Sequence, residues 1–191
     1  EEADEAKKYG LSPGDFKVVD PNGDYKYAAI QDKQFIGYST PRYRIGFRND
    51  FTFFKSLTVS MFLRSDLGHI GAFTDGKRPS GSDTYDRRNT SDFPYWTAEN
   101  RNNEYPRLNT NTTVFGGGID MYFSRSFLRV QDLSVAYDFP KQLFEKYGLT
   151  RLKAFVAARN LATIHGWPKW DPESPDVPMP KTFSVGLNVS L

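Results

Sequence analysis

The chain has 191 residues, enough for one ordinary domain, and 38% of them are hydrophobic while 16% are aromatic. Its 25 basic and 23 acidic residues leave a formal net charge of +2, which gives no reason to expect nucleic acid as a partner. Cysteine is absent, which excludes disulfides and thiolate metal sites. The sequence contains no run of 18 apolar residues, so no transmembrane helix is predicted. Many aromatic residues on a polar background suit strands that are apolar on one side only, or a sugar-binding surface.

The first part of the chain, residues 1–40, is rich in turn-forming residues and is predicted to be a loop segment with one short helix near Glu2–Lys8. Apolar residues then alternate with polar ones, which predicts strands over 41–54 and 57–64. Because so few residues separate these strands, they are expected to form an antiparallel hairpin.

Residues 65–126 show no periodicity, and we expect a long loop there, of a kind that is usually functional or disordered. Alternation returns over 127–139, with a phase slip near Gln131 that predicts a β-bulge. Helical spacing in residues 140–148 predicts one or two turns of helix, and a further strand is expected over 151–162.

The last predicted strand, 181–191, follows a second long loop over 163–180 and has the most regular alternation in the chain. One of its faces carries Phe183, Val185, Leu187, Val189 and Leu191, which we expect to face lipid. The predicted fold class is therefore all-β, with about five antiparallel strands.

The predicted connections differ in length in a regular way along the chain. Short links follow the first and third strands, while long loops follow the second and fourth, so antiparallel order places the two kinds at opposite ends. Large transmembrane barrels have this geometry, with short periplasmic turns, here containing a short helix, and long extracellular loops. The alternative is a soluble carbohydrate-binding β-sandwich with its site in the aromatic loops.

Three segments resemble the C-terminal third of SusC/RagA-type TonB-dependent transporters of Bacteroidota. The first contains GDFK at 14–17, DPNGD at 20–24, IG at 36–37 and PRY at 41–43. The second is SFLRVQDLSVAY at 126–137. The third contains VAARNL at 156–161, WDPE at 170–173 and PKTFSVGLN at 180–188. Order and spacing agree over nearly the whole chain.

The resemblance implies a barrel of about 22 strands with an N-terminal plug and a TonB box, in the outer membrane. Its implied partners are a SusD-like surface lipoprotein, the remainder of the barrel and the plug, the TonB complex through the N-terminal part, and membrane lipid. Such transporters import oligosaccharides or peptides. We expect this chain to supply about five strands, which cannot close alone because small barrels need about eight. The sequence leaves open whether the chain is a fragment, a truncated gene product or a split subunit.

Two features depart from the family pattern. The candidate metal ligands Asp20, Asn22 and Asp24 would belong to a calcium loop, but Tyr25 replaces its last glycine and Gln31 its late carboxylate. We therefore favour a simple turn and predict no cofactor or metal. Leu191 stands where barrel-assembly signals usually end in Phe.

Aromatic residues in the loops are candidates for ligand and membrane contact. Candidate sugar-stacking residues are Phe93, Tyr95, Trp96 and Tyr105, with loop packing or lid contact as the favoured alternative. Trp167 and Trp170 are candidate membrane-interface anchors, with loop packing equally open.

Catalytic residues are not predicted anywhere in the sequence. His69 and His165 have no partner at ligand spacing, and Glu99 and Glu104 are better explained as solvated loop residues than as a glycosidase pair. The chain is therefore not expected to be an enzyme.

Overall fold

The computed structural model describes residues 2–17, 19–26, 28, 30–73, 94–108, 110, 121–174 and 177–191. The chain divides into two compact units, unit 1 (Glu1–Ile36 and Ala72–Tyr122) and unit 2 (Gly37–Gly71 and Phe123–Leu191). In the described part, no helix has the length and apolar character needed to cross a membrane.

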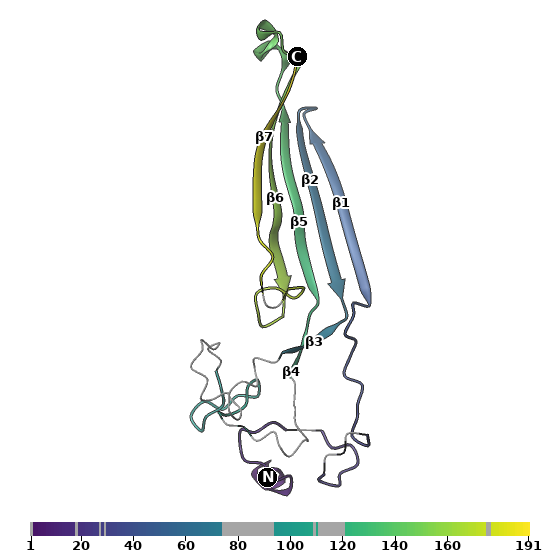
Figure 1. Ribbon diagram of the computed structural model, residues 1–191, viewed down its shortest axis with the longest axis vertical. Coiled ribbons are helices and arrows are strands. Elements are labelled where there is room, and N and C mark those ends of the chain that lie inside the picture. Colours follow the sequence, from purple (N-terminus) through teal and green to yellow (C-terminus); the bar gives the residue numbers. More distant parts are fainter. Residues whose placement is uncertain are drawn as a thin grey trace. The chain divides into compact units, whose positions relative to one another are not determined.

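Unit 2 is built on one antiparallel sheet with the strand order β1-β2-β5-β6-β7 (Figure 1). Its strands are β1 (Tyr43–Phe53), β2 (Leu57–Leu67), β5 (Phe127–Asp138), β6 (Arg151–His165) and β7 (Thr182–Ser190). Among these five strands, each pairs antiparallel with the one that follows it in sequence, and β2 therefore pairs with β5. The all-β, antiparallel fold class is thereby confirmed.

The connections differ at the two ends of the sheet (Figure 1). Residues 54–56 join β1 to β2, and residues 139–150, with the short turns η4 (Lys141–Leu143) and η5 (Glu145–Tyr147), join β5 to β6. We call this the turn end. Residues 166–181 join β6 to β7 at the other end, the loop end. Short and long connections are thus segregated, as the lengths of the predicted links indicated.

The tightest connection is the turn between β1 and β2. Phe54 and Lys55 have φ angles of 52° and 61°, and the Ser56 amide donates to the Phe53 carbonyl at 3.1 Å. Two successive positive φ angles match the twist of a two-residue hairpin, although Asn and Gly are the residues that usually adopt them.

The predicted bulge near Gln131 is confirmed. The register between β5 and β6 shifts between Val130 and Asp132, and Asn160 on β6 has a φ angle of 52°. The register between β2 and β5 shifts next to the same place. The alternation of β5 therefore slips by one residue at the bulge, so that Leu128, which pairs with Ile164, lies on the same face as Val135.

The expectation of an unbroken loop over 65–126 is corrected. Strand β2 continues to Leu67, and the short strands β3 (Ile70–Phe73) and β4 (Met121–Ser124) pair with each other. The extension of β2 escaped the pattern because its residues are polar: Ser65 and Asp66 are buried and hold hydrogen bonds or ion pairs. In the same way β6 continues to His165, beyond the predicted end at 162.

The remaining elements agree closely with the predicted ranges. Helix α1 (Glu2–Lys8) occupies the range expected for the short helix. Strands β1, β5 and β7 lie within the predicted ranges 41–54, 127–139 and 181–191.

The sheet has very little apolar core. Among the described residues, the buried hydrophobic side chains are Leu11, Phe73, Phe127, Phe144 and Trp167. Strands β1 and β7 are exposed along almost their whole length, on both faces. A single sheet layer with both faces open cannot be stabilised by burial within the described chain, so its apolar side chains need an outside medium or partner.

Candidate functional site

The two faces of the sheet differ in chemistry along every strand. Residues directly opposite each other in a ladder share a face, so the register gives continuous rows of side chains across the sheet. One row consists of Phe51, Val59, Val135, Val156 and Val185. The next row consists of Phe53, Leu57, Tyr137, Ala154 and Leu187. We call this the apolar face.

The apolar face is open in the described structure. Val185 is 80% exposed, and the other predicted lipid-facing residues, Phe183, Leu187, Val189 and Leu191, are exposed as well. Leu128 and Ile164 extend this exposed surface beyond the bulge. An apolar surface that crosses five strands is larger than the scattered apolar residues of ordinary soluble surfaces, and it marks contact with lipid or with protein.

The opposite face is polar. The row next to the Phe51 row, on the side away from the Phe53 row, consists of Asp50, Ser60, Ser134, Ala157 and Ser184. Nearer the bulge, Arg159 donates to Asp132 at 3.1 Å in a solvent-exposed ion pair. We call this the polar face; its hydroxyl and charged groups suit contact with water or with a polar solute.

Two aromatic rings interrupt the polar face, and each covers a glycine on the neighbouring strand. An added Cβ at Gly186 would lie 2.5 Å from the ring of Phe155, its ladder partner. Gly46 lies under the ring of Phe62, and the Arg48 guanidinium lies 5.2 Å from the centre of that ring. The rings therefore cover exposed glycine backbone, and this pairing also helps to fix the strand register.

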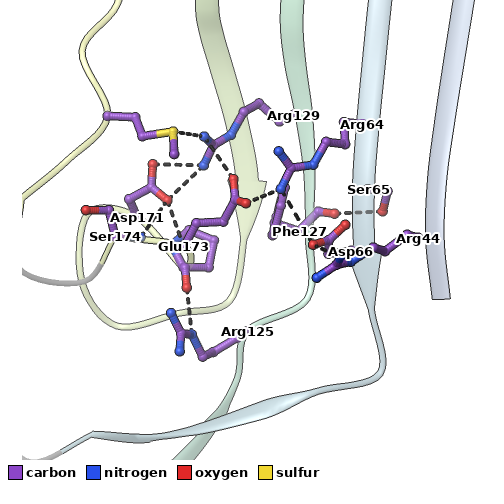
Figure 2. A network of polar contacts seen from close by, with 12 residues as sticks. Arg44, Arg64, Ser65, Asp66, Arg125, Phe127, Arg129, Asp171, Glu173 and Ser174 are labelled. Atoms are coloured by element: carbon purple, nitrogen blue, oxygen red, sulfur yellow. Dashed lines mark hydrogen bonds and ion pairs between the residues drawn. The ribbon is translucent and has the colours of Figure 1, made fainter. Parts of the chain in front are cut away.

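A cluster of charged residues lies at the loop end of the sheet (Figure 2). Arg129 on β5 donates through Nη2 to both carboxylate oxygens of Asp171 at 2.8 Å, and its Nη1 also contacts the Met179 sulfur. Glu173 pairs with Arg64 and lies 3.1 Å from Arg129. The cluster ties β2 and β5 to the loop that joins β6 to β7.

Further contacts extend the cluster on both sides. The Arg125 Nε donates to the Pro172 carbonyl at 2.6 Å, and its guanidinium lies 5.4 Å from the centre of the Trp167 ring. On the other side, Asp66 lies 3.5 Å from both Arg44 and Arg64. Opposite charges alternate through this cluster, which is how buried ionic groups are tolerated.

The two predicted interface tryptophans have different surroundings. Trp167 is buried, which favours loop packing, the alternative that the sequence left open for it. Trp170 is 72% exposed and remains a predicted interface anchor.

In unit 1, Trp96, Arg107 and Thr110 contact the segment around Asp15. The Asp15 carboxylate accepts hydrogen bonds from Arg107 Nε at 2.7 Å and from the Thr110 hydroxyl at 3.0 Å. The Arg107 amide donates to the Gly14 carbonyl at 2.7 Å, and the Trp96 ring covers Gly14. Gly14 has a φ angle of 87°, and an added Cβ there would lie 2.4 Å from a Trp96 ring carbon.

The candidate ligand-contact aromatics are only partly brought together. Trp96 packs on Gly14, Tyr95 is exposed, and Tyr105 is half-buried. Burial raises the pKa of the Tyr105 hydroxyl, and the neighbouring Glu104 carboxylate adds to the shift. Phe93 lies outside the described residues. A sugar-stacking role for these four side chains stays a prediction.

The candidate calcium ligands form a turn whose oxygens accept hydrogen bonds. Asp20 accepts from the amides of Gly23 and Tyr25 at 2.8 Å, Asn22 from that of Asp24 at 3.0 Å, and Asp24 from that of Lys26 at 2.8 Å. In the described part of the chain, no three His, Asp or Glu side chains are grouped to hold a metal ion. The geometry suits an Asx-type turn.

This turn is linked to α1 through Tyr9, whose hydroxyl donates to Asp20 at 3.0 Å. Removal from water opposes ionisation of Asp20, but hydrogen bonds from the Tyr25 and Gly23 amides and from Tyr9 outweigh it, so the Asp20 pKa falls below its ordinary value. Desolvation and the hydrogen bond to Asp20 raise the pKa of Tyr9 to about 12. The contact is therefore a neutral hydroxyl donating to a carboxylate.

The two histidines lie buried or half-buried near the loop end, apart from each other in the ladder. His165 pairs with Phe127, and His69 follows β2 and is 7% exposed. Burial lowers the His69 pKa, and the positive charge of Arg125 lowers it further. Among the described residues, no nucleophilic side chain is shown in hydrogen-bond contact with either histidine, and a catalytic role for them is not proposed.

The charge cluster is the feature that sequence reasoning missed. The WDPE and FLRV segments were noted as family motifs, but their contact was not predicted. The sequence did contain one signal. Arg64 and Arg129 lie on the polar side of two predicted strands, close to the strand ends that face the same end of the sheet. Two positive charges so close together require acidic partners. The acids come from the loop, whose path periodicity cannot predict.

Comparisons with known proteins agree with this geometry. The chain is 27% identical to TonB-dependent receptor P3 of Formosa agariphila over 92% of its own length and 19% of that protein. It superposes on the RagAB peptide transporter with a TM-score of 0.66 and 21% identity, covering 94% of this chain and 20% of that one. The open-open state of the RagAB peptide importer gives a TM-score of 0.61 at 21% identity, over 91% of this chain and 20% of that one. No family model matches the chain.

The chain thus spans about a fifth of the length of these relatives. The match to RagAB concerns the fold, and the match to the receptor concerns the sequence along nearly the whole chain. Together they confirm the resemblance to the C-terminal portion of a SusC/RagA-type TonB-dependent transporter, and the structural match is consistent with the fold of a partial β-barrel.

Proposed function

We propose that this chain supplies part of the barrel wall of a TonB-dependent outer-membrane transporter that imports glycans or peptides. The observation that carries the proposal is the open apolar face, which crosses all five strands opposite a mainly polar face. A barrel wall needs this arrangement, because its outer side meets lipid while its inner side is wet. The chain then works by passage of a solute and performs no covalent chemistry.

The partners follow from the same proposal. Strands β1 and β7 are the edges of the sheet and have a neighbour on one side only in the described structure, so the rest of the barrel would pair with them. A SusD-like lipoprotein would act at the loop end, and the plug and the TonB complex would act through parts of the transporter outside this chain. RagAB is a peptide transporter, which supports peptides beside glycans as the substrate class.

The soluble β-sandwich is the competing function, and the apolar face argues against it. A sandwich buries its apolar faces between two sheets about 10 Å apart. Within the described residues, the second sheet consists of the two short strands β3 and β4. The strongly exposed Val185 and Leu187 therefore have no second sheet above them.

Cysteine accessibility tests the proposal cleanly, because the chain has no native cysteine. Ser184→Cys and Val185→Cys are neighbours on β7 that point to opposite faces. In outer-membrane vesicles, a water-soluble maleimide should label position 184 and leave position 185 unlabelled, while a lipid-soluble maleimide should label position 185. Equal labelling of both positions by the water-soluble reagent would contradict the proposal.

A further inference from the structure

The loop of residues 166–181, which joins β6 to β7, folds back onto the sheet at the loop end (Figure 2). The register shows which face it meets. Arg64 and Arg129 are ladder partners and lie on the side of the sheet that carries Asp132 and Ser60, which is the polar face. Since the loop binds both arginines, it lies over the polar face.

Two arginines directly opposite each other in a ladder repel, so this pair is unfavourable by itself. Asp66 on β2 lies 3.5 Å from Arg64, but Arg129 receives its negative charges from the loop residues Asp171 and Glu173. The sequence of the strands therefore requires the loop in this position, because without it the Arg129 charge would be left uncompensated.

Three consecutive loop residues are each bound by an arginine. Both oxygens of Asp171 accept from Arg129, the Pro172 carbonyl accepts from Arg125, and Glu173 pairs with Arg64 and Arg129. The Asp171 carboxylate also accepts from the amides of Glu173 and Ser174, at 2.9 and 3.4 Å. The ionic contacts and the local turn thus hold the same tripeptide.

Burial makes these contacts strong. Arg129 is 1% exposed, Asp171 is 5% exposed, and Pro172 is fully buried. Ion pairs in such surroundings are screened little by salt, and breaking one leaves an unpaired buried charge.

We propose that the segment Asp171–Ser174 of this loop is a fixed constriction of the pore, permanently latched onto the polar face by Arg64, Arg125 and Arg129. The description of the polar face as the pore side depends on the proposed function, whereas the latch itself does not. The segment Asp171–Ser174 is then a rigid part of the rim, and solute passes beside it without displacing it.

The acid–base behaviour of Asp171 supports a permanent latch over an acid-sensitive one. Burial opposes ionisation of Asp171, but the Glu173 amide and the Arg129 guanidinium outweigh it, so the Asp171 pKa lies below its ordinary value of 3.8. A lowered folded-state pKa means that the stabilising charge is fully present above pH 3.8 and is lost only as the pH falls through the lower value. Because this loss lies below pH 3.8, the Asp171–Arg129 pair is expected to hold from neutral pH to pH 5.

Hydrogen exchange measured by mass spectrometry tests the latch in the whole protein, purified in detergent. In the wild type, the amides of Glu173 and Ser174 should exchange at least tenfold more slowly than unprotected amides, at pH 7 and at pH 5 alike. Asp171→Asn should speed their exchange by tenfold or more while β5 and β6 keep their protection. The matched control Asp132→Asn, which breaks the exposed pair with Arg159, should change nothing in the loop.

Three outcomes would contradict the latch. The amides of residues 173 and 174 could be unprotected in the wild type, or their exchange rates could be unchanged in Asp171→Asn. The third outcome is that Asp171→Asn reduces protection equally in the loop and in β5 and β6. If Asp171→Asn does not fold, the milder Glu173→Gln, which keeps the Arg129–Asp171 pair, decides between the same outcomes. The proposed function can fail independently of the latch. In that case the water-soluble maleimide would label the cysteine at position 185, while the amides of residues 173 and 174 would still be protected from exchange.

Discussion

The strands of unit 2 and the segments that lie between strands are stabilised in different ways. The strands follow one rule along their length, with apolar and polar side chains alternating between two open faces. The segments follow no repeat and are fixed by a few specific contacts, such as Arg129 with Asp171 in the loop of residues 166–181 and Arg107 with Asp15 in unit 1.

This difference shows where single substitutions should matter. On the apolar face, the stabilising free energy is distributed over many similar side chains. It depends on the medium that covers these side chains. A segment held by one buried ion pair depends on that pair alone. Substitutions in the strands should therefore act in the membrane, and those in the segments should act in any medium.

The largest effect is expected from Arg129→Met, which removes the centre of the charge cluster. The substitution leaves the buried carboxylate of Asp171 unpaired, and removing one partner of a buried pair costs on the order of 3–5 kcal/mol of unfolding free energy. Urea unfolding of the detergent-solubilised protein measures this loss.

The matched control for this change is Arg159→Met, which breaks an exposed ion pair on the neighbouring strand. Exposed pairs contribute about 0–1 kcal/mol, so this variant should stay close to the wild type. Similar losses in both variants would show that burial does not distinguish the loop contacts from those of the strands.

The next effect concerns the apolar face. Val185→Arg should destabilise the membrane-integrated protein by roughly 2–4 kcal/mol if position 185 lies near the bilayer midplane. Ser184→Arg, on the opposite face of the same strand, is the matched control and should have little effect. Folding into lipid vesicles, followed by urea titration, compares the two; equal losses would mean that β7 does not have one lipid side and one water side.

The strands could be predicted because the alternation of apolar and polar residues is visible in the sequence of each strand alone. It does not depend on knowing which strands pair with each other. Even the bulge at Gln131 left a visible slip in the pattern. The ends of β2 and β6 could not be predicted this way, because they include the polar side chains Asp66 and His165, which interrupt the apolar pattern. Asp66 is buried and lies beside Arg44 and Arg64.

The charge cluster was harder still to predict. Alternation shows that Arg129 lies on the polar side, but it does not show which acids reach it, since Asp171 is 42 residues away in a loop without periodicity. The same holds for Arg107 and Asp15, which are 92 residues apart. Long-range contacts between loops depend on chain paths that a local pattern does not contain.

A smaller effect is expected in unit 1 from Gly14→Ala. The new Cβ would lie 2.4 Å from the Trp96 ring, at a backbone φ of 87°, so crowding and backbone strain should together cost roughly 1–3 kcal/mol. Gly10→Ala is the control, because Gly10 has a similar φ of 70° but open space around it. Near-ultraviolet circular dichroism and thermal unfolding compare the two variants; equal effects would mean that backbone strain alone matters and that the Trp96 contact does not fix this segment.

The smallest effect is expected at the hairpin turn of the strands, and it should be a gain. Phe54 and Lys55 both have positive φ angles, which Asn and Gly adopt with less strain. The double substitution Phe54→Asn and Lys55→Gly should therefore raise the unfolding free energy by roughly 1 kcal/mol, measured by urea titration in detergent. Phe54→Ala is the control, because it removes the exposed ring without favouring a positive φ, and it should give no gain. If the alanine variant gains as much as the double variant, the exposed ring and not the backbone limits this turn, and the strands too would depend on specific local contacts.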